Sequence, residues 1–262
     1  MSKLRERDIE LKSIIRYKQN PVCKPMFYTP NLWIHVERVT WITQQLCKSL
    51  KLDTSLSQTI IRKAMFHDDS EIIAWDFATP EKRSWSEERK REYEQECLQA
   101  IPILTARYGQ ELWDDYEHIL REEENKEQSD SLEHAIIEYA DKLDALMETF
   151  HELYSGNSAF LNSMYPVFWR DMTCWEYIKS RVVKRRNKLE AMLGSSIEEK
   201  WLFATWELCK CDIKNIVISG VAHSKTSIAQ NSGFEIYDSW KNLHFENGNP
   251  EHREYLYNIY QT

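Results

Sequence analysis

The sequence contains few residues that interrupt helices: six glycines and seven prolines among 262 residues. Glycine disfavours helices through its conformational freedom, and proline does so because it lacks a backbone N–H. We also find no persuasive alternation of apolar and polar residues, which is the pattern typical of β-strands. The scarcity of all three signals predicts an all-α protein.

Long apolar runs are missing as well. No stretch approaches the roughly 18 apolar residues that a membrane-spanning helix requires. The first residues, MSKLRERDIELKSIIRY, are charged and lack the apolar core of a signal peptide. We therefore expect a cytoplasmic protein without membrane contact.

The six cysteines, at positions 23, 47, 97, 174, 209 and 211, form no CxxC pair. Cys209 and Cys211 are two residues apart, so a helix would direct them to different faces. We interpret all six as reduced and mostly structural.

An excess of positive charge is also absent, because 42 acidic residues outnumber 34 basic ones and the net charge is −8. This balance argues against stable nucleic-acid binding, although a local basic patch remains compatible with it. The one basic run, RVVKRRNK at 181–188, falls in a helical pattern, and we interpret it as a solvated helix face.

The chain does contain enough apolar material for a large core, with 42% hydrophobic and 12% aromatic residues. Capping residues and apolar spacing predict a series of helices. They cover 4–17, Asn31 to about Leu50, Asp53 or Thr54 to the HDD run at 67–69, Ser84 to about Ile101, 111–125, and 130–155 before Gly156, with two or three more up to about 218. FATPEKR at 77–83 and KEQSD at 126–130 are predicted to be a turn and a loop.

The stretch AMFHDDSEIIAWD, residues 64–76, places one histidine and four acids among apolar residues. A carboxylate beside apolar surface is costly unless it is paired, hydrogen-bonded or bound to a metal. One interpretation is a helix end whose acids cap the next helix. The other is a functional site.

Two further positions favour a site. His35 shares a face with the apolar residues of its helix, and Asp141 lies on a long helix that is apolar on more than one side. Either residue alone has a simpler explanation, as a hydrogen-bonded core histidine and a solvent-facing acid. Together with His67 and Asp68 they would form a mixed N/O ligand set that suits one divalent ion such as Mn²⁺, Co²⁺, Fe²⁺ or Zn²⁺.

The order H…HD…D in an all-α chain resembles the HD-domain metal-dependent phosphohydrolases. HDDSEIIAWDFATP, residues 67–80, is similar to the HDxSEφxxxDφxTP segment, where φ is apolar, of the bacterial HD-domain 5'-deoxyribonucleotidases. YSGNSAF at 154–160 resembles a GNxxF segment of that group, and IIRY at 14–17 resembles its Arg-aromatic pair, in which the aromatic residue is usually Trp. The likeness covers about 10–195 and leaves 196–262 without a counterpart.

The resemblance implies an HD-domain helical bundle over 1–195 and a helical or loop extension over 196–262 that packs on it. It assigns the metal to His35, His67, Asp68 and Asp141. The other assignments are Glu71 as general acid/base, Asp76 as a catalytic residue that holds the sugar or only caps the turn before Pro80, Arg16 on the phosphate, Tyr17 on the sugar, and Lys142 as a second positive charge or a plain surface lysine. Asp69 is expected to be a solvated or capping acid.

The expected activity is removal of the phosphate from deoxynucleoside 5'-monophosphates. Two alternatives stay open: a deoxynucleoside triphosphate triphosphohydrolase, and a non-catalytic nucleotide-binding protein. A small-molecule nucleotide is the expected partner. A homodimer is a further expectation, because relatives of this type are commonly dimeric and the helices expected beyond residue 165 are rich in tryptophan, with Trp169, Trp175, Trp201 and Trp206.

Overall fold

The computed structural model describes residues 2–16, 26, 30–77, 79–109, 112, 114–124, 130–154, 157, 174–194, 237 and 239–241. Within these residues the regular structure is helical, apart from an isolated antiparallel β-bridge between Ile15 and Asn31. The all-α prediction is therefore confirmed. None of the helices described is both long enough and apolar enough to cross a bilayer.

The helices are α1 (Lys3–Ser13), α2 (Leu32–Ser49), α3 (Thr54–Phe66), α4 (Glu71–Ala74), α5 (Thr79–Ser84), α6 (Glu87–Leu104), the π-helix η1 (Thr105–Gly109), α8 (Tyr116–Glu123), α9 (Leu132–Tyr154) and α11 (Cys174–Leu193).

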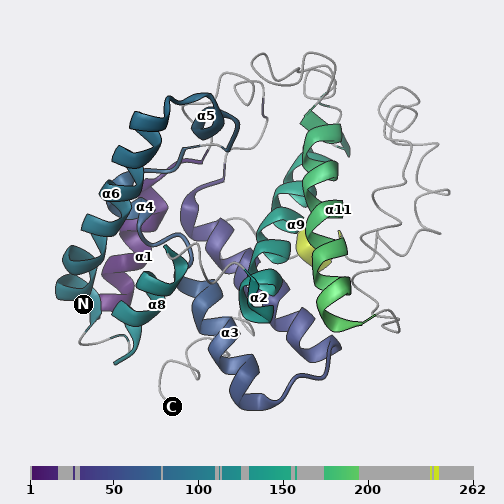
Figure 1. Ribbon diagram of the computed structural model, residues 1–262, viewed down its shortest axis with the longest axis horizontal. Coiled ribbons are helices and arrows are strands. Elements are labelled where there is room, and N and C mark those ends of the chain that lie inside the picture. The colour runs from purple at the N-terminus through teal and green to yellow at the C-terminus, as the bar shows by residue number, and fades with distance from the viewer. Residues whose placement is uncertain are drawn as a thin grey trace.

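Helix α9 is the centre of the main bundle, and it packs against α2, α3 and α11. Figure 1 shows α9 and α11 side by side, with α1, α4 and α6 on the other side of α2 and α3. The apolar stripe predicted for α9 faces this core, and Ile136, Leu143 and Leu146 are fully buried. Ile137 and Ala140 on a second face are buried too, which agrees with the prediction of a central helix.

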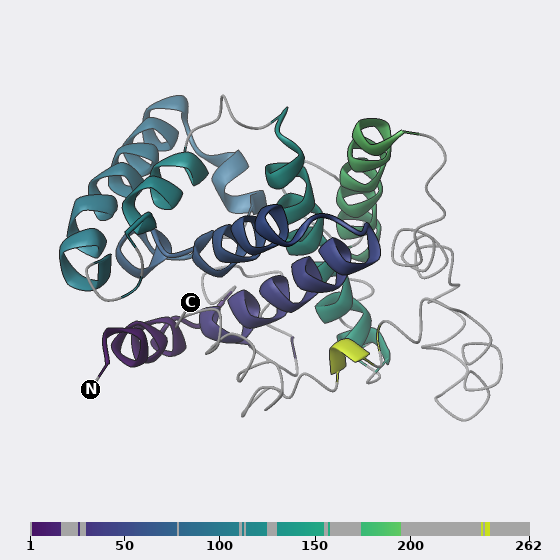
Figure 2. The same ribbon diagram turned by 90° about the horizontal axis from the view of Figure 1, so that it is seen from below.

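A second group of helices packs beside the main bundle. Helix α6 contacts α4, η1 and α8, and η1 also contacts α8. Figure 2 shows α6 and α8 together at one end of the molecule, away from α11. Their shared core includes Tyr116 and Leu104, and Met65 and Phe66 join it from the last turn of α3. The end of α3 therefore lies at the junction of the two groups.

Two predicted N-caps are observed. The side chain of Asn31 accepts a hydrogen bond from the backbone N–H of Ile34 at 3.0 Å, and Asp53 accepts one from Leu56 at 2.9 Å. A cap of this kind stabilises a helix by about 1 kcal/mol. These caps define the first turns of α2 and α3.

The helix predicted for 4–17 ends earlier, at Ser13. Ile14 is extended, with φ −93° and ψ 109°, and the backbone N–H of Arg16 donates to the carbonyl of Pro30 at 3.0 Å. The chain leaves the helix because 14–16 pair with the segment that precedes α2. This pairing brings Arg16 close to the start of α2.

Three other boundaries differ from the sequence-based prediction. The expected turn at 77–83 contains the short helix α5, in which Pro80 occupies a first-turn position that needs no N–H donor. Helix α6 begins at Glu87 after a cap by Ser86, not at Ser84. Within the helix predicted for 111–125, the described residues 114–115 form a turn and α8 covers Tyr116–Glu123.

The basic run at 181–188 is not simply a solvated face. Arg185 Nη2 lies 2.8 Å from Glu138 Oε1 on α9, and Lys188 Nζ lies 3.9 Å from Glu138 Oε2. Arg186 pairs with Glu190 along α11 at 2.6 Å. Part of the run therefore attaches α11 to α9.

Several predictions fall outside the described residues. These are Tyr17, Gly156, most of the loop at 126–130, the helices expected between 195 and 218, and most of the extension at 196–262. Cys47 and Cys97 are buried free thiols, as expected.

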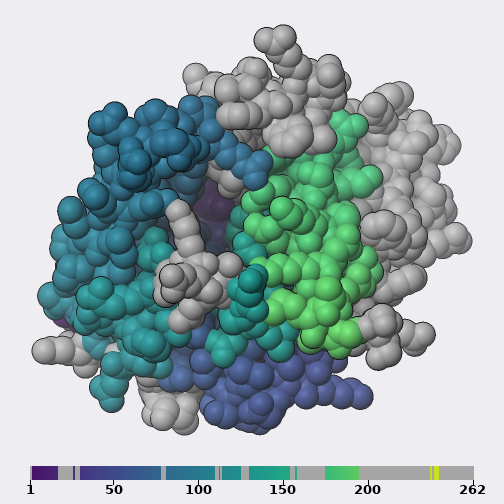
Figure 3. All heavy atoms as spheres, viewed as in Figure 1, coloured from purple at the N-terminus to yellow at the C-terminus, as the bar shows by residue number. Residues whose placement is uncertain are grey.

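Figure 3 shows a hollow on one face, between the blue atoms of α5 and α6 and the green atoms of α11, with purple N-terminal atoms at its floor.

Candidate metal centre

His35 lies in the first turns of α2 and is completely buried. Its Nδ1 atom is 2.8 Å from Asp144 Oδ2. A carboxylate that accepts from Nδ1–H holds the imidazole in one orientation and leaves the Nε2 lone pair for a cation. Nε2 of His35 thus faces away from Asp144 and toward the end of α3.

His67 and Asp68 follow the end of α3, where the chain turns before α4. His67 Nδ1 lies 2.7 Å from the carbonyl oxygen of Ala64, which can only accept, so Nδ1 is the donor. The Nε2 atom of His67 then lies 3.3 Å from Nε2 of His35. Asp68 Oδ2 lies 3.2 Å from His35 Nε2 and 3.4 Å from His67 Nε2. The turn therefore directs both neighbours to one point, which a regular helix would not do.

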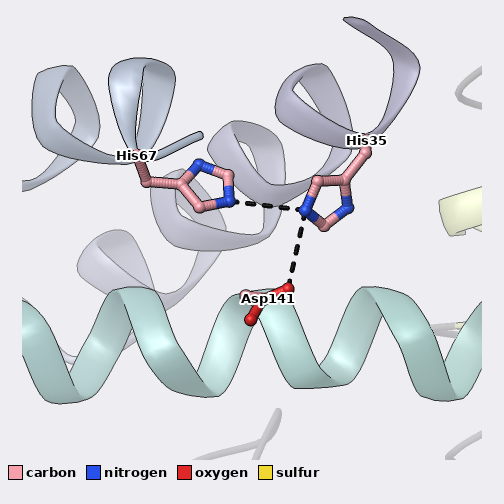
Figure 4. A group of neighbouring side chains, drawn as sticks. All are labelled: His35, His67 and Asp141. Atoms are coloured by element: carbon pink, nitrogen blue, oxygen red, sulfur yellow. Dashed lines mark hydrogen bonds and ion pairs between the residues drawn. The ribbon is translucent and has the colours of Figure 1, made fainter. Parts of the chain in front are cut away.

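Asp141 reaches the same point from α9. Its Oδ1 atom lies 3.5 Å from His35 Nε2, and Figure 4 shows His35, His67 and Asp141 pointing toward one another from three separate segments. One ligand atom from each of these three residues lies within 4.8 Å of the others. An ion with ligand bonds of about 2.1 Å places neighbouring ligand atoms about 3–3.5 Å apart, so the spacing suits one metal ion.

The charge of the cluster also fits a cation. Burial and Arg16 lower the pKa of His35, but hydrogen bonds to Asp144 and Asp68 outweigh them and raise it to about 9. Burial raises the pKa of Asp68, but His67 and His35 lower it by more, so the net shift of this pKa is downward. The pKa of Asp141 is also lowered, because Lys142 and His35 outweigh its burial. The pocket thus favours a bound positive charge, which a metal ion supplies in competition with a proton.

Glu71 begins α4, one turn after the His67-Asp68 pair, and only 8% of its surface is exposed. Lys82 of α5 donates to its Oε1 at 3.3 Å. Burial, together with the charges of Asp68 and Asp76, raises the pKa of Glu71 well above its usual value. A buried carboxyl with a raised pKa is suited to proton transfer near neutral pH.

Arg16 lies between two carboxylates. Its Nε is 3.7 Å from Asp76 Oδ2, and its Nη1 is 3.8 Å from Asp144 Oδ2. Asp144 also contacts His35, so the guanidinium lies next to one of the candidate metal ligands. The structure therefore brings Arg16 and Asp76, two of the predicted site residues, to the same side of the cluster.

Lys142 forms an ion pair with Asp141, its neighbour in the chain. It thus stands beside a predicted ligand and is partly exposed. Tyr17, the predicted sugar contact, lies outside the described residues.

The expectation for Asp69 is wrong. Asp69 is completely buried, and it accepts from Arg7 Nε at 2.7 Å, Arg7 Nη2 at 2.5 Å and the hydroxyl of Tyr116 at 2.7 Å. Its side chain contacts α1 and α8, whereas Asp68 and Asp141 lie beside His35 of α2. The acid is a structural anchor and not a solvated cap.

Two residues at the site were missed in the sequence. Asp144 supports His35, and Lys82 contacts Glu71. Asp144 follows Asp141 by three positions in DKLD, so a helix places both carboxylates on one side. That spacing was available as a signal, whereas the position of Lys82 depends on how α5 packs.

A model of the family described as "5'-deoxynucleotidase YfbR-like" matches residues 10–169 of this chain. The chain is 30% identical over 135 residues to a 5'-deoxynucleotidase of Pectobacterium atrosepticum, and 31% identical over 135 residues to the 5'-deoxynucleotidase yfbR of Photorhabdus temperata. Each match covers 50% of this chain, and 65% and 66% of the two relatives. The similarity thus spans less than two thirds of either relative.

Proposed function

Because the chain belongs to the YfbR-like 5'-deoxynucleotidase family, we propose that it hydrolyses deoxynucleoside 5'-monophosphates to deoxynucleosides and phosphate. The observation that carries the proposal is the convergence of His35, His67 and Asp141 within 4.8 Å. Both curated relatives have the name 5'-deoxynucleotidase. The family and the geometry thus support the same chemistry.

The proposed cofactor is one divalent transition ion, Mn²⁺, Co²⁺, Fe²⁺ or Zn²⁺. His35, His67, Asp68 and Asp141 would hold it, because their donor atoms face one point and both histidine Nδ1 atoms already have acceptors. Such an ion supplies Lewis-acid chemistry, which activates water and offsets charge on a phosphoryl oxygen.

Glu71 is proposed as the general acid/base. Hydrolysis adds water to phosphorus and breaks the bond to the 5' oxygen, so a proton must leave the water and another must reach the departing oxygen. Glu71 is buried next to the turn that carries His67 and Asp68, and its pKa is raised. It can therefore exchange a proton with the attacking water or with the departing 5' oxygen. Lys82 limits the orientations of its carboxyl group.

The substrate would be held by residues on the Arg16 side of the cluster. The guanidinium of Arg16 offers a fork that matches phosphate oxygens, and Asp76 beside it at 3.7 Å would hold sugar hydroxyls. Tyr17 follows Arg16 in the chain and would pack on the sugar. Lys142 would add a second positive charge near the phosphate.

The first assay compares dAMP, AMP and dATP at equal enzyme with Mn²⁺ or Co²⁺. We expect dAMP to release phosphate fastest, with AMP slower by less than about 10²-fold, because a pocket that only lacks space for a hydroxyl discriminates weakly. Faster hydrolysis of AMP would contradict the sugar assignment. Triphosphate release from dATP with dAMP inert would identify a triphosphohydrolase instead. Nucleotide binding without any hydrolysis would identify a non-catalytic protein.

We also propose a cytoplasmic homodimer. Of the four tryptophans named in the sequence analysis, Trp175 lies within the described residues and is buried, so the proposal rests on Trp169, Trp201 and Trp206. Light scattering of the full chain at micromolar concentration should show a dimer. A mass of 31.4 kDa, that of one chain, would contradict it.

A further inference from the structure

A short part of the C-terminal segment, residues 237 and 239–241, packs against the main bundle next to Asp144. Tyr237 and Trp240 are both completely buried, within the same core as α9. These residues lie beyond 169, where the family match ends. The chain therefore adds a contact to this core from a segment that the family model does not cover.

Trp240 contacts the residue that supports a proposed metal ligand. Its indole Nε1–H donates to Asp144 Oδ1 at 2.6 Å. The other oxygen of that carboxylate, Oδ2, is 2.8 Å from His35 Nδ1. A continuous path of two hydrogen bonds thus runs from the indole through Asp144 to the imidazole whose Nε2 faces the ligand cluster.

The indole is held tightly in place. Arg38 lies over its ring at 4.2 Å from the centroid, and Arg38 Nη1 also pairs with Glu148 at 3.0 Å. Tyr237 stacks against Trp240 with ring centroids 5.9 Å apart, and its hydroxyl is 2.7 Å from His151 Nδ1. Contacts with Arg38 and Tyr237 thus hold the indole with its N–H toward Asp144.

The contact matters because Asp144 is a buried carboxylate, which needs hydrogen bonds to both oxygens to keep one orientation. Arg16 Nη1 lies 3.8 Å from Asp144 Oδ2 and Arg38 Nη1 lies 4.0 Å from Oδ1, and both distances exceed that of a hydrogen bond. The indole donates directly to Oδ1. Without it, the carboxylate could rotate away from the position in which Oδ2 accepts from His35.

We propose that Trp240 is a positioning residue for the metal centre, acting on His35 through Asp144. The inference rests on the metal site of the proposed function, but not on its substrate. Partners that orient metal-ligating residues typically contribute 10–100-fold to metal affinity. The effect on metal binding, measured without substrate, is therefore the quantity to test.

The test is a cobalt titration of the full chain, followed by its visible absorption spectrum. Trp240→Phe keeps most of the aromatic packing and removes the N–H donor. We expect its Kd for Co²⁺ to rise by about 10–100-fold and its spectrum to change. Wild-type affinity with a wild-type spectrum would overturn the proposal.

Tyr237→Phe is the matched control. It removes the hydroxyl that contacts His151 in the same segment but leaves the path to Asp144 intact. A purely structural role for the segment would weaken cobalt binding in both variants equally, and that result would overturn the proposal. An unchanged Kd in Tyr237→Phe supports it.

A double-mutant cycle tests the path itself. In an Asp144→Ala background the effect of Trp240→Phe should nearly vanish, because no carboxylate is left for the indole to orient. Full additivity of the two changes in binding would show that the indole acts by another route, and would overturn the proposal.

Hydrogen exchange on the wild-type chain covers the case in which Trp240→Phe does not fold. Coupling between two sites is reciprocal, so metal binding should increase the protection of backbone amides at 239–241. Increased protection around His35 without any change at 239–241 would overturn the proposal, as would a wild-type chain that binds no cobalt. A chain that binds cobalt as expected but hydrolyses no deoxynucleotide would contradict the proposed function alone.

Discussion

At the residue scale, the candidate metal centre depends on hydrogen-bond acceptors for the Nδ1 atoms of His35 and His67. Asp144 and the carbonyl of Ala64 each lie within 2.8 Å of an Nδ1 atom, so both Nε2 lone pairs face the same point. Asp68 and Asp141 add negative charge there. Other groups of the protein thus orient the side chains that we propose as metal ligands.

Asp68→Ala should lose most of its bound metal, because it removes the carboxylate that lies within 3.4 Å of both Nε2 atoms. Metal content per chain, measured by mass spectrometry after dialysis, checks this expectation. Glu92→Ala changes an exposed acid on α6 and serves as the control. Full metal retention in Asp68→Ala would remove this residue from the ligand set.

Glu71→Gln should keep metal and nucleotide binding but lose turnover by about 10²–10⁴-fold, because the amide has nearly the same shape and cannot exchange a proton. The value of kcat for dAMP, together with metal content, measures both effects. Glu92→Gln should behave as wild type. Near-normal kcat in Glu71→Gln would make Glu71 a structural acid.

At the scale of elements, the turn after α3 that carries His67 and Asp68 is held by contacts from α1 and α8. Arg7 of α1 donates to both carboxylate oxygens of Asp69 and to the carbonyl of Met65. Tyr116 of α8 donates to the same carboxylate. Helices α1 and α8 are thus attached to the segment that carries His67 and Asp68.

Asp69→Ala should destabilise the fold by about 3–5 kcal/mol, because it removes the carboxylate that accepts two hydrogen bonds from the buried guanidinium of Arg7. Urea unfolding measures the change. The exposed pair Lys3–Glu6 provides the control, since Lys3→Ala should cost no more than about 1 kcal/mol. The double variant Arg7→Met/Asp69→Leu should be more stable than Asp69→Ala, and equal stability would argue against a charge effect.

At the scale of the whole molecule, the candidate metal centre brings together segments that are distant in sequence. Its residues come from α2, the turn after α3 and α9, and the second helix group meets the main bundle at that turn. An ion bound there would contact α2, the turn after α3 and α9 at the same time only in the folded state.

Metal should therefore raise the melting temperature of the full chain. Binding to the folded state alone stabilises it by about 2.7 kcal/mol at a free-metal concentration of 100 times Kd. Differential scanning fluorimetry with Mn²⁺ or Co²⁺ should show an increase of several degrees. Asp68→Ala should show little increase, and an equal shift in that variant would indicate binding elsewhere.

Local signals in the sequence were enough for the helical class and for several boundaries. Asn31 and Asp53 cap the helices predicted to follow them, because a cap acts on backbone groups only two or three residues away. The ligand candidates His35, His67, Asp68 and Asp141 were also found in the sequence, from their order and from the resemblance. Their assignment to a metal remains a prediction.

Tertiary structure alone decided the surroundings of these residues. Burial of Asp69 depends on Arg7, 62 positions away, and the orientation of His35 depends on Asp144, 109 positions away. Trp240 reaches Asp144 across 96 positions from a segment with no recognised counterpart. No local pattern specifies such contacts, because whether a carboxylate is solvated or buried is determined by which distant side chains pack against it.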